Sequence, residues 1–326
     1  MEAIGLISLG IDFIIAISLI SLAGSVLFAK NIFNAIIMFI IFGLLMAIAW
    51  VRLNAPDIAL AEAALGAGIT GALLLESLRK IRITEPETGA LLVSHNDNKN
   101  ELIGKLLVGV LTVTVAFYTI EALIPLAQAN QVLAPKVFEN LEASGVKNPV
   151  TAVLLNFRGY DTFLEIFVLY AALLGAWSIE NVSNCEAKEK EQPENFILVT
   201  LIKLLSPFIV LVASYILWVG SFNPGGAFQA GAILAGLAVF MALTGWHFVD
   251  KIPLLLLRTL VIVGPLYFAA ILVTSILLTG NLLQYSIDLA GVTIFSVEAF
   301  STISIFMVLF LLYLGDEPKS YFMRRS

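Results

Sequence analysis

Charged side chains are scarce in this chain. Asp, Glu, Lys and Arg make up 13% of its 326 residues, whereas hydrophobic residues make up 60% and the mean hydropathy is +0.97. A soluble globular domain carries about 25% charged residues. The scarcity therefore argues against a soluble domain. The long apolar runs along the chain are typical of bilayer-spanning helices, each of which needs about 20 residues.

Cysteine and catalytic motifs are also lacking. Cys185 is the single cysteine, which excludes an internal disulfide and a thiolate-bound zinc or iron–sulfur site made by this chain alone. There is no phosphate-binding loop, no Ser/His/Asp arrangement and no quinone or flavin motif, so we expect no catalytic residue and no cofactor. His95 and His247 stand in different loops, so we expect no metal site beyond a transient Na⁺. Without a basic patch interleaved with aromatic residues, nucleic acid is not an expected partner.

Apolar runs are what the chain does have, and they are continuous rather than alternating, which favours helices over a β-barrel. The expected fold class is therefore all-α, a polytopic integral membrane protein with about nine transmembrane helices. No positively charged segment precedes the first run, so we interpret it as a span rather than a cleaved signal peptide. The predicted spans are 5–28, 32–51, 57–79, 102–122, 161–181, 196–219, 226–246, 254–279 and 293–314.

Two polar stretches divide these spans into modules. They read TEPETGALLVSHNDNKNE and EAKEKEQPEN, and we interpret both as solvated cytoplasmic linkers. The predicted division is a three-helix module (1–83), a linker (84–101), a two-helix module (102–182), a second linker (183–195) and a four-helix module (196–326). Within the second module, the segment 124–160 is long and contains three prolines. We expect it to be partly helical and to lie on the outer surface, with a re-entrant hairpin as the alternative.

The distribution of positive charge predicts the orientation. With the N-terminus outside and nine crossings, only Arg52, Lys136, Lys147 and Arg158 of the 18 Lys and Arg residues fall on the outside. Cytoplasmic loops carry an excess of Lys and Arg. We therefore expect the N-terminus outside and the C-terminus in the cytoplasm.

Three unusual segments open helices on the predicted outer face. The first is NAPDIALAE, in which Pro56 and Asp57 suit the first turn of a helix. The second is NFRGYDTFLE, in which Arg158 precedes Asp161, a plausible N-cap. The third is NPGGAFQAG, in which Asn223 can cap a helix and the glycines allow close backbone approach; its motif residues are Pro224, Gly225, Gly226 and Gln229.

These segments resemble a known family. The first, followed by a Gly/Ala-rich span, is similar to the small D subunit of energy-converting membrane-bound hydrogenases and to the C-terminal part of the large Mrp antiporter subunit. The second resembles the E subunit, and the third resembles the F subunit, which is equivalent to the Mrp B subunit. The resemblance covers nearly the whole chain. It implies a fused D–E–F subunit of a sodium-translocating module, as found in Mrp antiporters and in archaeal hydrogen-evolving or sulfur-reducing complexes.

One position departs from this resemblance. The large Mrp subunit is expected to carry Gln where Glu62 stands and an acid one turn later, where this chain has Gly66. The chain is therefore more similar to the subunits of membrane-bound hydrogenase or sulfane sulfur reductase than to those of a stand-alone antiporter. An acidic role cannot be transferred from the Mrp position to Gly66.

Acidic residues within the predicted spans are the candidate functional residues, because a charge in the bilayer is costly and marks ion pathways. Carboxylates suit hard cations and can also carry protons. Most of these acids fall a few residues into a span from the outer side. Glu62 and Glu76, 14 residues apart, share one helix face, and Asp12 is expected at a depth where it could neighbour Glu62. The ion-path candidates are Glu62, Asp12, Glu165, Glu298 and Glu76.

The expected function is that of a non-redox membrane subunit that contributes carboxylates to a monovalent cation path, with Na⁺ and H⁺ as the transported ions. The expected partners are other Mrp-like antiporter subunits, membrane subunits of a hydrogenase-like or complex-I-like assembly, and lipids, in the plasma membrane. Two alternatives stay open. One is a structural scaffold subunit in which each acid is merely satisfied by neighbouring polar groups. The other is an autonomous transporter, against which the lack of inverted repeats counts.

Overall fold

The computed structural model describes residues 2–84, 99–128, 133–180, 196–245 and 252–315. Within these ranges the chain forms helices and connecting turns, without a β-strand. Eight helices are long and apolar enough to cross a membrane. The prediction of an all-helical, multi-pass membrane protein is thereby confirmed. Most residues of the two predicted linkers lie outside the described residues. The same is true of His95 and His247.

The first group of helices contains three spans. The third of them is a continuous helix with a π-helical segment, η1, in its middle. The bounds of the group are α1 (Glu2–Leu27), α2 (Ile32–Arg52), α3 (Pro56–Ala61), η1 (Glu62–Ile69) and α4 (Thr70–Thr84).

The second group is a bundle of five helices, of which four are candidate spans. The seventh predicted span, 226–246, corresponds to α11, which is apolar but only 17 residues long. The bounds of the group are α9 (Gly159–Glu180), α10 (Phe196–Val219), α11 (Ala227–Leu243), α12 (Leu254–Thr279) and α13 (Ile287–Leu314).

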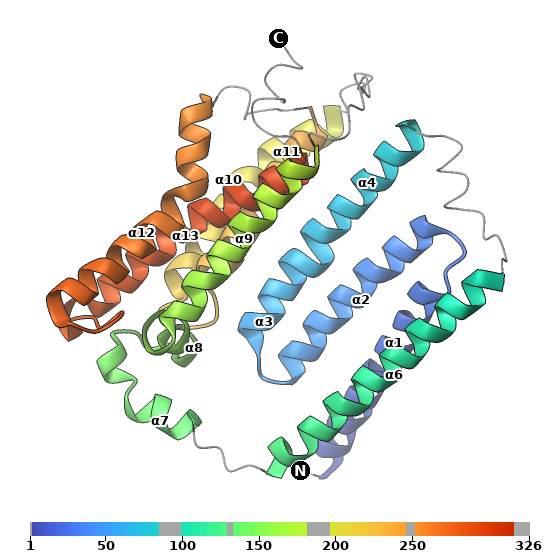
Figure 1. Ribbon diagram of the computed structural model, residues 1–326, viewed down its shortest axis with the longest axis horizontal. Helices are drawn as coiled ribbons and strands as arrows, with labels where there is room; N and C mark the ends of the chain where they lie inside the picture. The colour runs from blue at the N-terminus through green and yellow to red at the C-terminus, as the bar shows by residue number, and fades with distance from the viewer. Residues whose placement is uncertain (1, 85–98, 129–132, 181–195, 246–251, 316–326) are drawn as a thin grey trace.

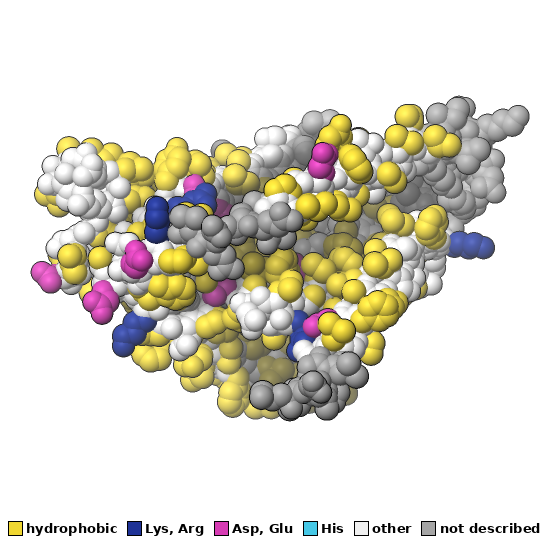
Figure 2. Space-filling model, turned by 90° about the horizontal axis from the view of Figure 1, so that it is seen from below, with side chains coloured by type: hydrophobic (Ala, Val, Ile, Leu, Met, Phe, Trp, Pro, Cys, Tyr) yellow, Lys and Arg dark blue, Asp and Glu magenta, His cyan; other side chains and the backbone are white. Residues whose placement is uncertain are grey.

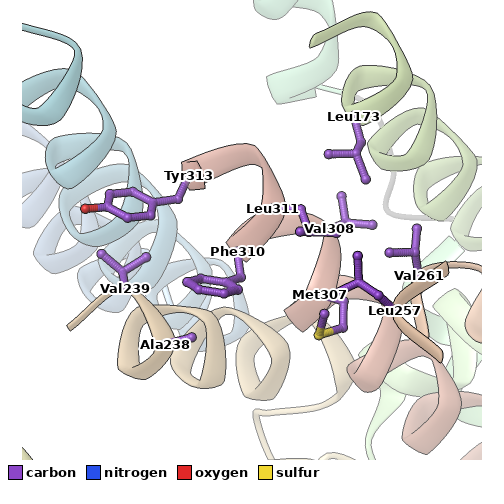
Figure 3. Packing of buried hydrophobic residues seen from close by; sticks show 10 residues of the cluster. All are labelled: Leu173, Ala238, Val239, Leu257, Val261, Met307, Val308, Phe310, Leu311 and Tyr313. Carbon is purple, nitrogen blue, oxygen red and sulfur yellow. The ribbon is translucent and has the colours of Figure 1, made fainter. Parts of the chain in front are cut away.

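Helix α13 is the centre of this bundle, and 67% of its spanning window is buried. Figure 3 shows its side chains between those of α9, α11 and α12. Phe310 lies near Ala238 and Val239, while Val308 lies toward Leu173. Because this part of α13 is enclosed by the other helices, four of its polar residues are buried by this chain alone: Glu298, Ser301, Thr302 and Ser304.

Helix α6 (Lys99–Gln128) stands apart from α9, its partner in the predicted two-helix module. In Figure 1 the helices α2 and α4 lie between α6 and α9. None of the spanning window of α6 is buried by the described residues, and the same holds for α1. Helix α6 therefore presents nearly its whole surface to lipid or to other subunits, whereas α1 packs one side against α2.

The segment between α6 and α9 is partly helical, as expected. It contains α7 (Leu133–Glu139), the 3₁₀ turn η2 (Glu142–Ser144), α8 (Pro149–Ala152) and the π-helical η3 (Val153–Phe157). In Figure 1 these elements lie along one edge of the molecule, where α1 and α3 begin. Figure 2, which views this edge, shows hydrophobic side chains with Lys, Arg, Asp and Glu side chains between them, most of the charged ones in its left half.

The start of the first helix and the end of the last described helix lie on opposite edges of the helical layer. Figure 1 shows α1 beginning at the lower edge and α13 ending toward the upper edge. This arrangement agrees with an odd number of crossings. That the lower edge faces outward stays a prediction from the distribution of Lys and Arg.

Candidate functional site

The first and third motifs meet at one junction between the two helix groups. Asp57, in the first turn of α3, accepts a hydrogen bond from the backbone N–H of Gly225 at 2.9 Å. Gln229 Nε2 in turn donates to the backbone oxygen of Asp57 at 3.2 Å. These contacts join the start of α3 to the start of α11 across more than 160 residues of sequence. Helix-start chemistry explains why Asp57 is where it is, but the sequence offered no signal for this partner.

The two glycines at this junction are required by the backbone. Gly225 and Gly226 have φ values of +154° and +125°, a region that residues with a Cβ rarely adopt. A Cβ on Gly225 would lie 2.5 Å from the backbone oxygen of Ile216, and one on Gly226 would lie 2.7 Å from Glu298 Oε1. The glycines thus let the carboxyl of Glu298 approach the backbone where α11 begins. Gly226, rather than the expected Asn223, occupies the N-cap position.

Glu298 is the buried acid of the site, with a residue exposure of 3%. Its carboxyl accepts a hydrogen bond from the backbone N–H of Ala227. Its Oε2, in contrast, has no hydrogen-bond partner among the described residues, and neither does Ser301 Oγ one turn along α13. An ionised carboxylate in such a place is strongly destabilising unless it gains a partner. The N-terminus of α11 favours negative charge there, and the open oxygen can accept a proton or a cation.

Glu298 also lies farther along its helix than the sequence suggested. We expected the last span to begin at residue 293, but α13 begins at Ile287. At about 1.5 Å per residue, Glu298 is roughly 16 Å from the start of the helix rather than near its outer end. The predicted start of this helix was wrong, because Ile287 to Val292 continue it although they include Gly291, a weak helix former.

Residues of the segment between α6 and α9 hold the loop that precedes α11. Asn148 Nδ2 donates to the backbone oxygens of Gly220 and Asn223, at 3.1 and 3.0 Å. Thr151 Oγ1 donates to the same Gly220 oxygen at 2.6 Å. Irregular backbone inside a membrane protein is tolerated where its polar groups are satisfied within the protein. This segment therefore supports the Pro-Gly-Gly turn next to Glu298.

The second motif is not part of the junction. Arg158 and Asp161 form an ion pair of 2.5 Å with both side chains largely exposed. Helix α9 begins at Gly159, so Asp161 lies in its first turn and is not the N-cap that we expected. Glu165 is exposed on the surface of α9. These charges lie on the exposed surface of the described chain and not at the buried carboxyl.

Two of the other candidate acids already have a basic partner. Asp12 pairs with Arg52 of α2 at 2.7 Å, on an exposed surface. Glu76 pairs with Arg79 of its own helix at 2.6 Å. The expectation that Asp12 would neighbour Glu62 is therefore replaced by an ion pair, because Arg52 at the end of α2 reaches across to α1.

Glu62 is the remaining candidate, and it opens the π-helical segment η1. The residue is partly buried, and its carboxyl forms no hydrogen bond or ion pair within the described part of the chain. Among the residues that the structure describes, no three His, Cys, Asp or Glu side chains gather into a metal-binding group. Of the five ion-path candidates, Glu62 and Glu298 are thus the two that are at least partly buried and have no basic partner among the described residues.

The sequence analysis missed two hydroxyl groups beside Glu298. Ser301 and Thr302 follow it by three and four residues, so helical periodicity places them on the same face. Thr302 Oγ1 donates to the backbone oxygen of Glu298 at 2.8 Å. This i, i+3, i+4 pattern in the printed sequence was a usable signal.

Comparison with known proteins agrees with this architecture. The MbhD family, described as the D subunit of MBH, matches residues 17–83, which hold most of the first helix group. The MnhB family, described as a "Domain related to MnhB subunit of Na+/H+ antiporter", matches residues 197–315, which hold α10 to α13. The two matches fall on the two sides of the Asp57–Gly225 junction.

Two individual proteins are similar over long stretches. The uncharacterized protein MJ1307 of Methanocaldococcus jannaschii is 30% identical over 207 residues, which cover 57% of this chain and 78% of that protein. The Mrp complex from Dietzia sp. DQ12-45-1b contains a chain with the same fold, with a TM-score of 0.74 and 19% identity over 94% of this chain. Our chain spans 35% of that longer chain. The chain belongs to the Mrp/Mbh family of antiporter-related membrane subunits, in which it joins a D-like module and an MnhB-like module in one polypeptide.

Proposed function

We propose that this chain is a non-redox membrane subunit of a sodium/proton antiporter module, and that its buried carboxyls form part of the path of a monovalent cation. Glu298 is the observation that carries the proposal. A residue that only packs α13 against α11 would be better apolar at 3% exposure, because the unpaired Oε2 opposes folding. A carboxyl that binds a proton or Na⁺ during transport accounts for this arrangement.

The driving force would come from elsewhere in the assembly. The D–E–F order of the motifs resembles hydrogen-evolving and sulfur-reducing respiratory complexes, so we propose that redox chemistry in other subunits is coupled to this module. The chain itself would carry no cofactor, and Na⁺ and H⁺ would be the transported ions. We place the assembly in the plasma membrane with the N-terminus outside.

Partner subunits would cover the exposed helices. Helix α6 buries none of its spanning window against the described residues, α1 is covered mainly on its α2 side, and Glu165 is exposed on α9. An exposed acid on a spanning helix is costly against lipid. We therefore propose other Mrp-like antiporter subunits, and membrane subunits of a hydrogenase-like or complex-I-like assembly, as neighbours.

The test is Glu298→Gln in the intact complex, assayed in inverted membrane vesicles. Sodium-dependent proton movement is followed with a pH-sensitive dye, and the amount of assembled complex is measured in the same membranes. Gln keeps the shape of the side chain but cannot exchange a proton, so we expect exchange to fall about tenfold or more at equal complex content. Exchange at the parent rate would remove Glu298 from the path.

A scaffold role is the second candidate, and the Asp57–Gly225 junction favours it. That contact joins the D-like and MnhB-like modules without involving Glu298 directly. A scaffold predicts that Glu298→Gln leaves exchange per assembled complex unchanged, whereas Asp57→Ala lowers the amount of complex. The two measurements in one set of vesicles separate the roles.

A further inference from the structure

We infer that Gly66 is a positioning residue for Glu62: its missing side chain gives the Glu62 carboxyl the space it needs to reach about one helical turn deeper into the membrane. This inference rests on the proposed ion path, because it assigns the place at which that carboxyl acts.

The carboxyl of Glu62 occupies the volume that a side chain at position 66 would fill. A Cβ on Gly66 would overlap Glu62 Oε1, and it would lie 2.9 Å from Glu62 Cδ and 3.6 Å from Oε2. Helical side chains usually lean toward the N-terminus of their helix. The Glu62 side chain leans the other way, toward the C-terminal turn.

The Glu62 side chain points in this direction from within the π-helical segment η1. It runs from Glu62 to Ile69, so both the acid and the glycine lie within it. Such segments are rare and frequently occur at functional sites, because they change the rotation of side chains about the helix axis. Here η1 brings the acid at its start over the glycine four residues later.

The resulting depth is close to the middle of the membrane. Gly66 is ten residues after Pro56, where α3 begins, which corresponds to about 15 Å of helix. The hydrocarbon core is about 30 Å thick. The sequence alone placed Glu62 near the outer mouth, because that estimate used the position of its backbone. The carboxyl reaches a depth along α3–η1 similar to that of Glu298 along α13.

Neighbouring helices fix the backbone on both sides of this position. A Cβ on Gly43 of α2 would lie 3.1 Å from Ala67 N, so the two helices are in close contact beside Gly66. On the other side, Ile69 packs in a buried cluster with Ala232 and Ala235 of α11. Because η1 is held between α2 and α11, an added methyl group at position 66 would displace the flexible carboxyl rather than the helix.

The first test is Gly66→Ala, with Gly68→Ala as the matched control. A Cβ at Gly68 meets only the oxygen of Ala63 at 3.5 Å, an ordinary contact. Both changes replace glycine by a better helix former, so neither is expected to destabilise the span. We expect Gly66→Ala to lower sodium/proton exchange in vesicles about tenfold, since misplacing a reacting group by about 1 Å can have a large effect. Gly68→Ala should stay near the parent rate.

A double-mutant cycle identifies the cause. In a Glu62→Gln background, where the carboxylate is already lost, Gly66→Ala should have no further effect. Equal effects of Gly66→Ala with and without the acid would overturn the inference, because they would show that the glycine serves packing alone.

The second test moves the charge. In Glu62→Ala/Gly66→Asp, the carboxyl carbon stands one bond, about 1.5 Å, from the Cβ at position 66, which places it within the volume of the original carboxyl. We expect this variant to recover most of the exchange that Glu62→Ala loses, whereas Glu62→Ala/Gly66→Asn, with the same shape and no charge, should not. Equal exchange in both double variants, at equal complex content, would refute the relocation. If neither variant assembles, the double-mutant cycle decides.

The outcome also distinguishes this inference from the proposed function. Parent-like exchange in Glu62→Gln would take Glu62 out of the ion path altogether. Loss in Glu62→Gln, combined with failure of both the cycle and the relocation, would leave the path intact and remove only the role of Gly66.

Discussion

The contact between Gly226 and Glu298 can be tested through stability. In Gly226→Ala, the new methyl carbon would start 2.7 Å from Glu298 Oε1 and would sit on a backbone with φ of +125°. The unfavourable backbone region costs about 1–3 kcal/mol. If the carboxyl moves away, the Ala227 N–H loses its hydrogen bond, whose contribution is about 0.5–1.5 kcal/mol to a protonated carboxyl and about 1.5–3 kcal/mol to an ionised one. We therefore expect a total destabilisation of about 1.5–6 kcal/mol.

The assay is heating of the purified complex, followed by measurement of the fraction that remains assembled. Gly236→Ala is the matched control, because it lies in the same helix α11 with nothing within 4 Å of the new Cβ. That control should be neutral or slightly stabilising, by up to about 1 kcal/mol. In a Glu298→Ala background, Gly226→Ala should retain only the backbone contribution. Parent-like stability of Gly226→Ala would refute both the φ argument and the approach of the carboxyl.

Two further predictions concern the outer edge of the bundle. Tyr285 has a buried hydroxyl without a partner among the described residues, so Tyr285→Phe should be neutral or stabilising in the same heating assay. Burial raises the pKa of Tyr285 from 10.0 to about 12. The folded state therefore keeps a proton that the unfolded state loses, so stability should fall as the pH rises from about 10 to about 12, and Tyr285→Phe should remove this part of the fall. Gly145→Ala should destabilise more than Gly280→Ala: both have φ near +80°, but only at Gly145 would the Cβ meet a neighbour, Ala290 Cβ at 2.5 Å. Equal losses in the two variants would contradict close packing of Gly145 on α13.

Eight of the nine predicted spans followed from the sequence because apolar length determines where helices cross a bilayer. The mutual approach of the first and third motifs did not follow, since Asp57 and Gly225 meet through a single side chain and a backbone N–H. Separation of α6 from α9 was also unforeseen. Hydropathy shows that a helix is apolar, but it does not show which other helix packs against it.

The candidate acids show the same limit at the level of single residues. In the sequence alone, Asp12 and Glu76 looked like unpaired carboxylates, but in the structure each has an arginine within ion-pair distance. Glu298 looked close to the surface because its helix was predicted too short. For Glu62, the depth of the carboxyl depends on the direction of a side chain in a π-helical turn, which spacing along an α-helix does not predict.

The bond between Asp57 and Gly225 has a consequence for how the chain is made. Its two partners are 168 residues apart. At about 5–20 residues per second, the ribosome needs roughly 8–34 s to extend the chain from one to the other. During that interval the D-like helices are already in the bilayer while their MnhB-like neighbour does not yet exist. Because both modules belong to one polypeptide, the MnhB-like module is made next to the D-like helices and in equal number.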